Sequence, residues 1–481
     1  MADTHLWNNI PTVVLFKIYS NLSRNERMQA SSTCKAWRES LFHPSIWPSK
    51  RIECNLINLT NGNKSESKRR RTAFKQFIGK CARFIHAIDF YFDCNCYTQL
   101  KELVDVISIL SSSAMQGTAL KRLSLKPIHI QLSVNHQSLS DAMFALLNAI
   151  QTFVARNPGL QHLSLGCLEE LLNATPSLLS IMAQNSKSIQ SLHLSTVKED
   201  PDYYPVHDIP LCLFEPFVSL RALSIDYDYI CDEFLTILAK KPLEKLIINV
   251  HGLDEEHPGV KRSSWSLLKA NSKLEVSVNL LHTDDSPDDL RKMILDTDIP
   301  LSHFRAFFLG ENTSITELVK SVALKHQNTL RSLVLVDCFS PSTLFPNPSF
   351  SRAAENELVM LAWRCKKLNH LTLIGYEISE VDLIAITRLR GSQLKELFIP
   401  SCCISLLHSP IIEDEGYYDD DRFYLDMAPP DLRSQVIADI AKPLNRDWIP
   451  MTFGEMPKAV FDPHFTPDTA YLPIIQREQC W

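Results

Sequence analysis

The sequence predicts an α/β fold with three parts: a small all-helical N-terminal domain, an irregular solenoid of strand–helix repeats, and a C-terminal tail rich in proline and aromatic residues. Two patterns predict this organisation, namely helically spaced apolar residues near the N-terminus and a leucine phrase that recurs after residue 80. The predicted boundaries are the helical domain at 1–50, a linker or first irregular strand with a basic insert at 51–80, the solenoid at 81–405, and an acidic insertion with a capping tail at 406–481.

The first predicted helix begins at Ile10-Pro11, where proline suits a first turn because its missing N–H has no partner to lose. The apolar side chains that follow at helical spacing are Val14, Leu15, Ile18 and Leu22. This face is too apolar for a free surface helix, so it packs on the second helix, which contains Trp37, on a partner, or on both. Because about fifty residues rarely form a self-sufficient core, a partner is plausible. The alternative is an ordinary helical cap on a larger domain.

The segment from about Leu6 to Trp47 resembles an F-box, the module that docks a substrate receptor onto the Skp adaptor of a cullin–RING ubiquitin ligase. The resemblance rests on Ile10-Pro11, the Val14-Leu15 pair, Cys34-Lys-Ala-Trp37 and the closing Ile46-Trp47. Two positions depart from the usual pattern, since Val13 replaces an acidic residue and Thr33 an aliphatic one. The resemblance implies that the following residues face the adaptor: Ile10, Pro11, Val14, Leu15, Ile18, Leu22 and Trp37.

The recurring phrase is Leu, two variable residues, Leu, one variable residue, then Leu or Ile. It begins at Leu120, Leu160, Ile189, Leu220, Leu243, Leu330, Leu368 and Leu394, with an aromatic version at Phe304, a weaker one at Ile85, and only the alternation around Leu274. Most steps lie at or slightly above the spacing of about 20–29 residues typical of leucine-rich repeats. Helical stretches such as 142–150 and 232–239 separate the phrases, so each unit is expected to be one strand plus one helix. The alternative is a compact α/β domain with coincident leucine strings.

An F-box followed by leucine-rich repeats resembles one arm of the F-box protein family, and the resemblance covers about residues 6 to 405. It implies a non-catalytic receptor that holds a protein substrate on its repeats while the adaptor, cullin and RING-bound enzyme supply the chemistry. The receptor would raise the effective concentration of a substrate lysine near the ubiquitin thioester. The alternative function is a leucine-rich-repeat scaffold with a vestigial F-box that binds partners without directing ubiquitin transfer.

The variable positions of each phrase are expected to line the concave face of the sheet. The candidate substrate-binding residues there are Lys121, Arg122, His162, His193, Arg221, Lys245, Arg331, His370 and Lys395. One interpretation is a groove for an acidic or phosphorylated degron. The other is a solvated sheet face, with binding elsewhere, for example on loops.

Composition indicates an intracellular protein without a dominant nucleic-acid or membrane role. The net charge is −6, and we see no apolar run of the ~18 residues that span a membrane. The 13 cysteines are scattered, as expected of reduced thiols in the cytoplasm or nucleus. Metal-binding Cys-x-x-Cys pairs, the Gly-x-Ser-x-Gly motif and His-Glu-x-x-His are absent from the sequence, so we expect no catalysis, metal or cofactor.

Three further segments leave alternatives open. The basic run 65–71 is interpreted as a flexible, solvated insert, and the alternatives are a nuclear localisation signal or a kinase site at Thr72. The acidic run 413–421 is interpreted as an exposed insertion. The tail beyond it is expected to cap the solenoid, and the alternative is a peptide that mimics a substrate in the groove.

Overall fold

The computed structural model describes residues 10–47, 51–114, 120–130, 137–185, 188–198, 206–254, 256–269, 273–340, 345–350, 356–406, 423–461 and 468–479. The chain forms two compact units. Unit 1 consists of Met1–Pro127, Leu132–Leu165 and Ala174–Ile189, and unit 2 of Ile128–Gln131, Gly166–Asn173 and Gln190–Trp481. The acidic run 413–421 lies outside the described residues.

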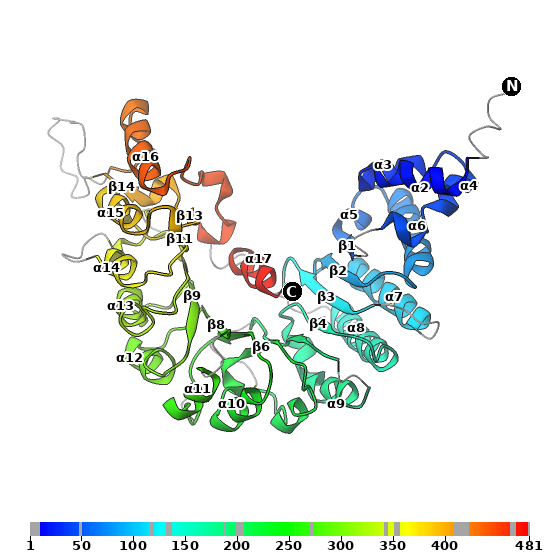
Figure 1. Cartoon of the computed structure of the whole chain (residues 1–481), viewed down its shortest axis with the longest axis horizontal. Coiled ribbons are helices and arrows are strands. Elements are labelled where there is room, and N and C mark those ends of the chain that lie inside the picture. Colours follow the sequence, from blue (N-terminus) through cyan, green and yellow to red (C-terminus); the bar gives the residue numbers. More distant parts are fainter. Residues whose placement is uncertain are drawn as a thin grey trace. The chain divides into compact units, whose positions relative to one another are not determined.

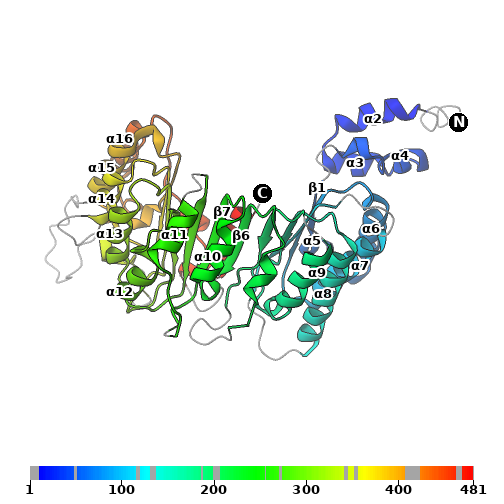
Figure 2. The same cartoon turned by 60° about the horizontal axis from the view of Figure 1, so that its bottom comes forward.

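Unit 1 begins with short helices and continues with alternating strands and long helices (Figure 2). Its elements are α2 (Thr12–Ser20), α3 (Arg24–Ala30), α4 (Lys35–Ser40), η1 (Pro44–Ile46), β1 (Arg51–Asn55), α5 (Leu56–Thr60), α6 (Lys64–Cys81), β2 (Ala87–Phe92), α7 (Tyr97–Ala114), β3 (Arg122–Pro127), α8 (Gln137–Arg156), β4 (His162–Ser164) and α9 (Thr175–Asn185).

Strands β1 to β4 pair in parallel, with apolar positions of successive repeats side by side. Ile52 lies opposite Ile88, Ile88 opposite Leu123, and Leu123 opposite Leu163. All four side chains are buried. Strand β1 lies within the predicted linker segment 51–80, and α5 begins directly after it at Leu56.

Helix α8 is, among the described residues, the one helix long and apolar enough to cross a membrane by length and composition. Its apolar side chains recur at helical spacing, and those from Leu139 to Val154 that face the repeats are buried. This burial is the ordinary environment of a core helix in a repeat protein.

The interpretation of the basic run 65–71 as a flexible insert is wrong. The run lies inside α6, which Asn63 caps by accepting a hydrogen bond from the Glu66 N–H at 2.8 Å. Arg71 of α6 contacts Glu102 of α7 at 2.9 Å, and Lys75 contacts Asp105 at 2.6 Å. Arg71, at the end of the run, and Lys75 therefore join two neighbouring helices of the repeat stack, whereas Lys68 and Arg69 are exposed.

Unit 2 continues the same alternation and ends in a C-terminal segment (Figure 1). Its elements are η2 (Glu169–Ala174, which ends at the unit boundary), β5 (Ser191–His193), η3 (Leu211–Phe214), β6 (Ala222–Asp226), η4 (Tyr227–Tyr229), α10 (Asp232–Ala239), β7 (Lys245–Val250), α11 (Arg262–Lys269), β8 (Glu275–Leu281), α12 (Pro287–Leu290), η5 (Arg291–Leu295), β9 (Leu301–Phe307), α13 (Ile315–Lys325), β10 (Ser332–Val336), η6 (Pro348–Phe350), α14 (Glu357–Arg364), β11 (His370–Ile374), β12 (Ile378–Ser379), α15 (Glu380–Arg390), η7 (Gly391–Gln393), β13 (Glu396–Phe398), η8 (Ser401–Cys403), β14 (Ile404–Ser405), α16 (Pro430–Leu444), η9 (Phe453–Glu455), η10 (Lys458–Val460) and α17 (Asp468–Glu478).

The strands of unit 2 form a parallel sheet in which leucine-phrase positions stack in register. Leu223 lies opposite Leu246, and Leu246 opposite Val276. One predicted register is wrong, because Phe304 lies opposite Leu333, the second apolar position of the next phrase. The phrase in that repeat therefore begins at Leu301 rather than at Phe304, next to an irregularity between Val276 and Ser277.

The helices α10 to α15 cover one face of the unit 2 strands, and α17 lies on the opposite face (Figure 1). We call this opposite face the inner face. Helix α16 packs on α15, the helix of the last complete repeat, and the Trp448 indole donates to the Leu397 carbonyl at 3.0 Å. The structure confirms the fold class: a helical N-terminal region followed by strands and helices in the alternation of a leucine-rich-repeat solenoid.

Candidate functional site

The N-terminal helices form a small core of their own. Tyr19 is fully buried, donates its hydroxyl to the Trp37 carbonyl at 2.9 Å, and packs edge-on against the Trp37 ring. Arg27 connects α2 with η1, because its guanidinium donates to the carbonyls of Tyr19 at 2.9 Å and Ile46 at 2.6 Å. A capping box between Ser23 and Glu26 starts α3.

An apolar surface remains exposed on α2 after this core has formed. Val13 is 78% exposed and Val14 48% exposed, and Met28 of α3 is also exposed. Pro11 is exposed as well, and Ile18 is half-buried. The helix therefore has one buried side, which contains Leu15 and Tyr19, and one apolar side that no described residue covers.

The predicted adaptor-facing residues divide between these two sides. Pro11 and Val14 are exposed, whereas Ile10, Ile18 and Leu22 are half-buried. Leu15 and Trp37 are buried inside the helical core, so they support the shape of the surface from within. Whether any of the seven contacts an adaptor stays a prediction.

The helical core is fastened to the first repeat by aromatic side chains. Trp47 packs edge-on against Phe77 of α6 with ring centroids 5.3 Å apart, and Phe42 lies 6.0 Å from the same ring. The Lys80 ammonium lies 4.6 Å from the centre of the Phe42 ring. These contacts leave Val13 and Val14 of α2 exposed.

A row of polar side chains crosses the inner face of unit 2 at one level of the sheet. Asp226 lies opposite Asn249, Asn249 opposite Asn279, and Asn279 opposite Arg305. Asn279 donates to Asn249 at 2.8 Å, and Arg305 donates to Asn279 at 3.0 Å. All four side chains are buried, which is unusual for a sheet face unless another element covers it.

Helix α17 is that covering element. Its Glu478 carboxylate accepts two hydrogen bonds from the Arg305 guanidinium, one of them at 2.8 Å, and its Glu478 carbonyl accepts from the Lys245 ammonium at 2.8 Å. Arg305 and Lys245 together hold the pKa of Glu478 down at about 2, although burial acts to raise it. Tyr471 packs edge-on against Phe307 and His282, so apolar contacts support the ion pair.

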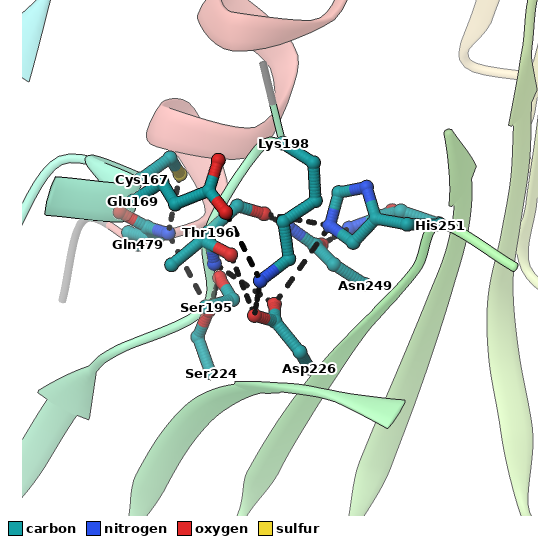
Figure 3. A network of polar contacts seen from close by, with 11 residues as sticks. Cys167, Glu169, Ser195, Thr196, Lys198, Ser224, Asp226, Asn249, His251 and Gln479 are labelled. Carbon is teal, nitrogen blue, oxygen red and sulfur yellow. Dashed lines mark hydrogen bonds and ion pairs between the residues drawn. The ribbon is translucent and has the colours of Figure 1, made fainter. Parts of the chain in front are cut away.

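At its other end the polar row continues into a buried cluster at the end of β6 (Figure 3). The Asp226 carboxylate accepts from the Thr196 N–H at 2.8 Å and hydroxyl at 2.6 Å, and the Lys198 ammonium lies 3.6 Å away. Burial raises the pKa of Asp226 to about 7 and lowers that of His251, 4.0 Å from it, to about 3. His251 is therefore neutral at physiological pH.

A pocket of about 590 Å³ remains open on the inner face, between α17 and strands β7, β9, β10, β11 and β13. Its lining is cationic and aromatic at the rim, where Lys395, Arg477 and Phe398 are exposed. The lining residues are Lys245, His303, Arg305, Ser332, Val334, Asn369, His370, Thr372, Ile374, Lys395, Glu396, Phe398, Met451, Pro473, Ile474, Arg477 and Glu478.

The structure brings three of the predicted substrate-binding residues together in this pocket: Lys245, His370 and Lys395. The others lie apart from it. Arg221 and Arg331 pair with Glu244 and Glu275, and His193 is buried against Ser191.

The remaining three candidates belong to unit 1. Lys121 is exposed, Arg122 lies 3.3 Å from the buried Asp89 carboxylate, and His162 is half-buried with its pKa lowered to about 4 by burial and by Arg122. Their role in substrate binding, like that of the pocket residues, stays a prediction.

Sequence reasoning missed Asp226, Asn249, Asn279, Arg305 and Glu478. The first four could have been found by extending the strand alternation, because they occupy sheet-face positions beside the apolar positions of their strands. Glu478 carried no such signal, since it follows no repeat phrase.

Comparison with known proteins agrees with this arrangement. Residues 7–53 match the F-box-like family model. The chain is 26% identical to human F-box only protein 33, over 81% of this chain and 76% of that protein. It is 24% identical to mouse F-box/LRR-repeat protein 21, over 92% of this chain and 89% of that protein.

The family match and the fold together describe a chain with an F-box at its N-terminus, followed by strands and helices in the alternation of a leucine-rich-repeat solenoid. Proteins of this class are typically substrate receptors of Skp–cullin–F-box ligases and are generally non-catalytic subunits. The F-box generally implies binding to the Skp adaptor.

Proposed function

We propose that this chain is the substrate-recognition subunit of a Skp–cullin–F-box ubiquitin ligase. Its F-box binds the Skp adaptor and its repeats bind a protein destined for ubiquitin-dependent degradation. The observation that carries the proposal is the exposed apolar side of α2, with Val13, Val14 and Pro11 uncovered although the rest of the F-box forms a packed core. Such a surface on a soluble domain favours a protein partner.

Ubiquitin transfer in this proposal needs no reactive group from the chain itself. The F-box holds the chain on the ligase core, and the repeats hold the substrate. Binding both at once makes the encounter between a substrate lysine and the ubiquitin thioester effectively intramolecular, which raises its rate through proximity.

The test is co-purification of the full chain with the Skp adaptor. Val14→Asp and Ile18→Asp place charges on the open side of α2 without touching the buried Leu15, so the fold should survive. Each is expected to weaken adaptor binding about tenfold or more, because a charge would be buried without a partner. Val218→Asp, at a valine of unit 2 that is 64% exposed, is the matched control and should bind normally.

Two outcomes separate the proposal from its alternative. Loss of adaptor binding together with loss of cullin-dependent ubiquitination of a bound partner supports the receptor. Adaptor binding that is absent in the unmodified chain, or bound partners that are never ubiquitinated, would instead support a scaffold that does not direct ubiquitin transfer. We further propose that the protein acts in the cytoplasm, the nucleus or both, where the ligase core and reduced cysteines coexist.

A further inference from the structure

The pocket on the inner face contains buried hydrogen-bond donors that nothing in the described chain satisfies. Arg305 is 3% exposed, and its Nε finds no acceptor among the described residues, although one outer nitrogen donates to Asn279 and Glu478 and the other to Glu478. Ser332, on the neighbouring strand, is 3% exposed, and its Oγ has no described partner either. Because buried polar atoms are nearly always hydrogen-bonded, these two mark a position for an acceptor in the pocket.

The charge of the lining also favours an anion. Four cations line the pocket, Lys245, Arg305, Lys395 and Arg477, against the carboxylates of Glu396 and Glu478. The pocket already binds one carboxylate by the same chemistry, because the Arg305 guanidinium donates to the Glu478 carboxylate. The Lys245 ammonium donates to the backbone carbonyl of the same residue. The Lys395 side chain makes no hydrogen bond or ion pair with the described residues, and both Lys395 and Phe398 are exposed at the rim.

We propose that this pocket is the substrate-docking site of the repeats, and that it binds a segment of a partner protein in which a glutamate or aspartate carboxylate adjoins a large apolar side chain. The carboxylate accepts from Arg305 Nε and Ser332 Oγ, with Lys395 and Arg477 supplying positive charge at the rim. The apolar side chain rests on Phe398, Met451 and Ile474. This inference depends on the proposed receptor function and names the chemistry of its substrate.

A carboxylate fits better than a phosphate for an electrostatic reason. Glu478 stays on Arg305, so any second anion on that guanidinium lies close to an existing negative charge. A phosphate carries about −1.5 to −2 at neutral pH and would meet stronger repulsion than a carboxylate with one charge. Helix α17 forms one wall of the pocket, with Pro473 and Ile474 in the lining.

The test uses the full chain in complex with the Skp adaptor and three capped hexapeptides observed by saturation-transfer NMR. The peptides place Glu-Leu, Gln-Leu or phosphoserine-Leu between Gly-Ser pairs, so they differ in one side chain. Binding is expected for the Glu-Leu peptide and not for the Gln-Leu peptide. The double variant Lys395→Gln/Arg477→Gln should weaken Glu-Leu binding about fivefold or more, and Ser332→Ala about threefold or more.

The control Lys320→Gln/Arg388→Gln removes one lysine and one arginine from the exposed surfaces of α13 and α15 and should leave binding unchanged. Equal binding of the Glu-Leu and Gln-Leu peptides would overturn the inference, as would preference for the phosphoserine peptide or insensitivity to the pocket variants. Adaptor binding is measured on the same samples. If the adaptor binds and the peptide does not, the pocket inference fails alone, and if the adaptor does not bind, the receptor function fails.

Discussion

Replacing Glu478 by glutamine tests whether the ion pair with Arg305 holds α17 on the inner face. Glu478 has its pKa lowered from 4.5 to about 2, a difference worth about 3 kcal/mol at 1.36 kcal/mol per pKa unit. Removing one partner of a buried ion pair leaves the other charge uncompensated, which typically costs about 3–5 kcal/mol. Glutamine keeps one oxygen for Arg305, so we expect a loss of about 2–3 kcal/mol.

This loss should appear first as local opening of α17, because α17 is the element that the pair attaches. Hydrogen exchange of the α17 amides in the Glu478→Gln variant should accelerate about 30- to 150-fold, since each 1.4 kcal/mol corresponds to a factor of ten. The matched control is Glu233→Gln, at an exposed glutamate on α10. An acceleration of less than about threefold would show that apolar packing around Tyr471, and not the ion pair, holds the helix.

Three further predictions follow from individual contacts. The stability difference between the unmodified chain and Glu478→Gln should depend on pH. The folded pKa of Glu478 lies below the unfolded value near 4.5, so the unfolded state binds more protons as the pH falls between these two values. The difference in free energy of unfolding is therefore full above pH 4.5 and is lost as pH falls towards 2, which urea unfolding at a series of acidic pH values would measure. Gly375→Ala should destabilise unit 2 by about 3 kcal/mol or more, because Gly375 has φ +81° and an added Cβ would clash with the Asp337 carbonyl oxygen. Gly159→Ala, with no atom within 4 Å of its added Cβ, should leave the melting temperature nearly unchanged. Tyr19→Phe should lower F-box stability by about 1 kcal/mol through the lost hydrogen bond to the Trp37 carbonyl, and an unchanged thermal unfolding curve would contradict that assignment.

Local patterning was sufficient to assign two of the three predicted parts, the helical N-terminal domain and the repeat solenoid. The apolar face of α2 and the leucine phrases each lie within a few residues of chain, and burial of one face of a helix or strand requires that spacing wherever it occurs. The strands at Ile88, Leu123, Leu223 and Leu333 are therefore found where the phrases predict them. The same signal failed at Phe304, because a run of aromatic and apolar residues from Phe304 to Leu309 allows more than one phase of the phrase.

The segment 65–71 was misinterpreted because its run of charges was considered without the helix-capping residue that precedes it. Its charges resemble a solvated insert, yet Asn63 three residues before Glu66 is a helix start, and the acidic residues of α7 that pair with Arg71 and Lys75 lie about thirty residues away. The charge run is thus part of a helix–helix contact that the segment alone does not reveal.

The periodic spacing of apolar residues therefore determined which segments became strands and helices, since each needs only its neighbours to bury its own apolar side. Long-range packing decided which surface remains available for binding. Arg305 and Glu478 are 173 residues apart in the chain, and only their approach places α17 over the polar row and leaves the pocket beside it. No spacing rule connects such distant residues, because the contact depends on how many repeats intervene and on where the final segment returns to the sheet.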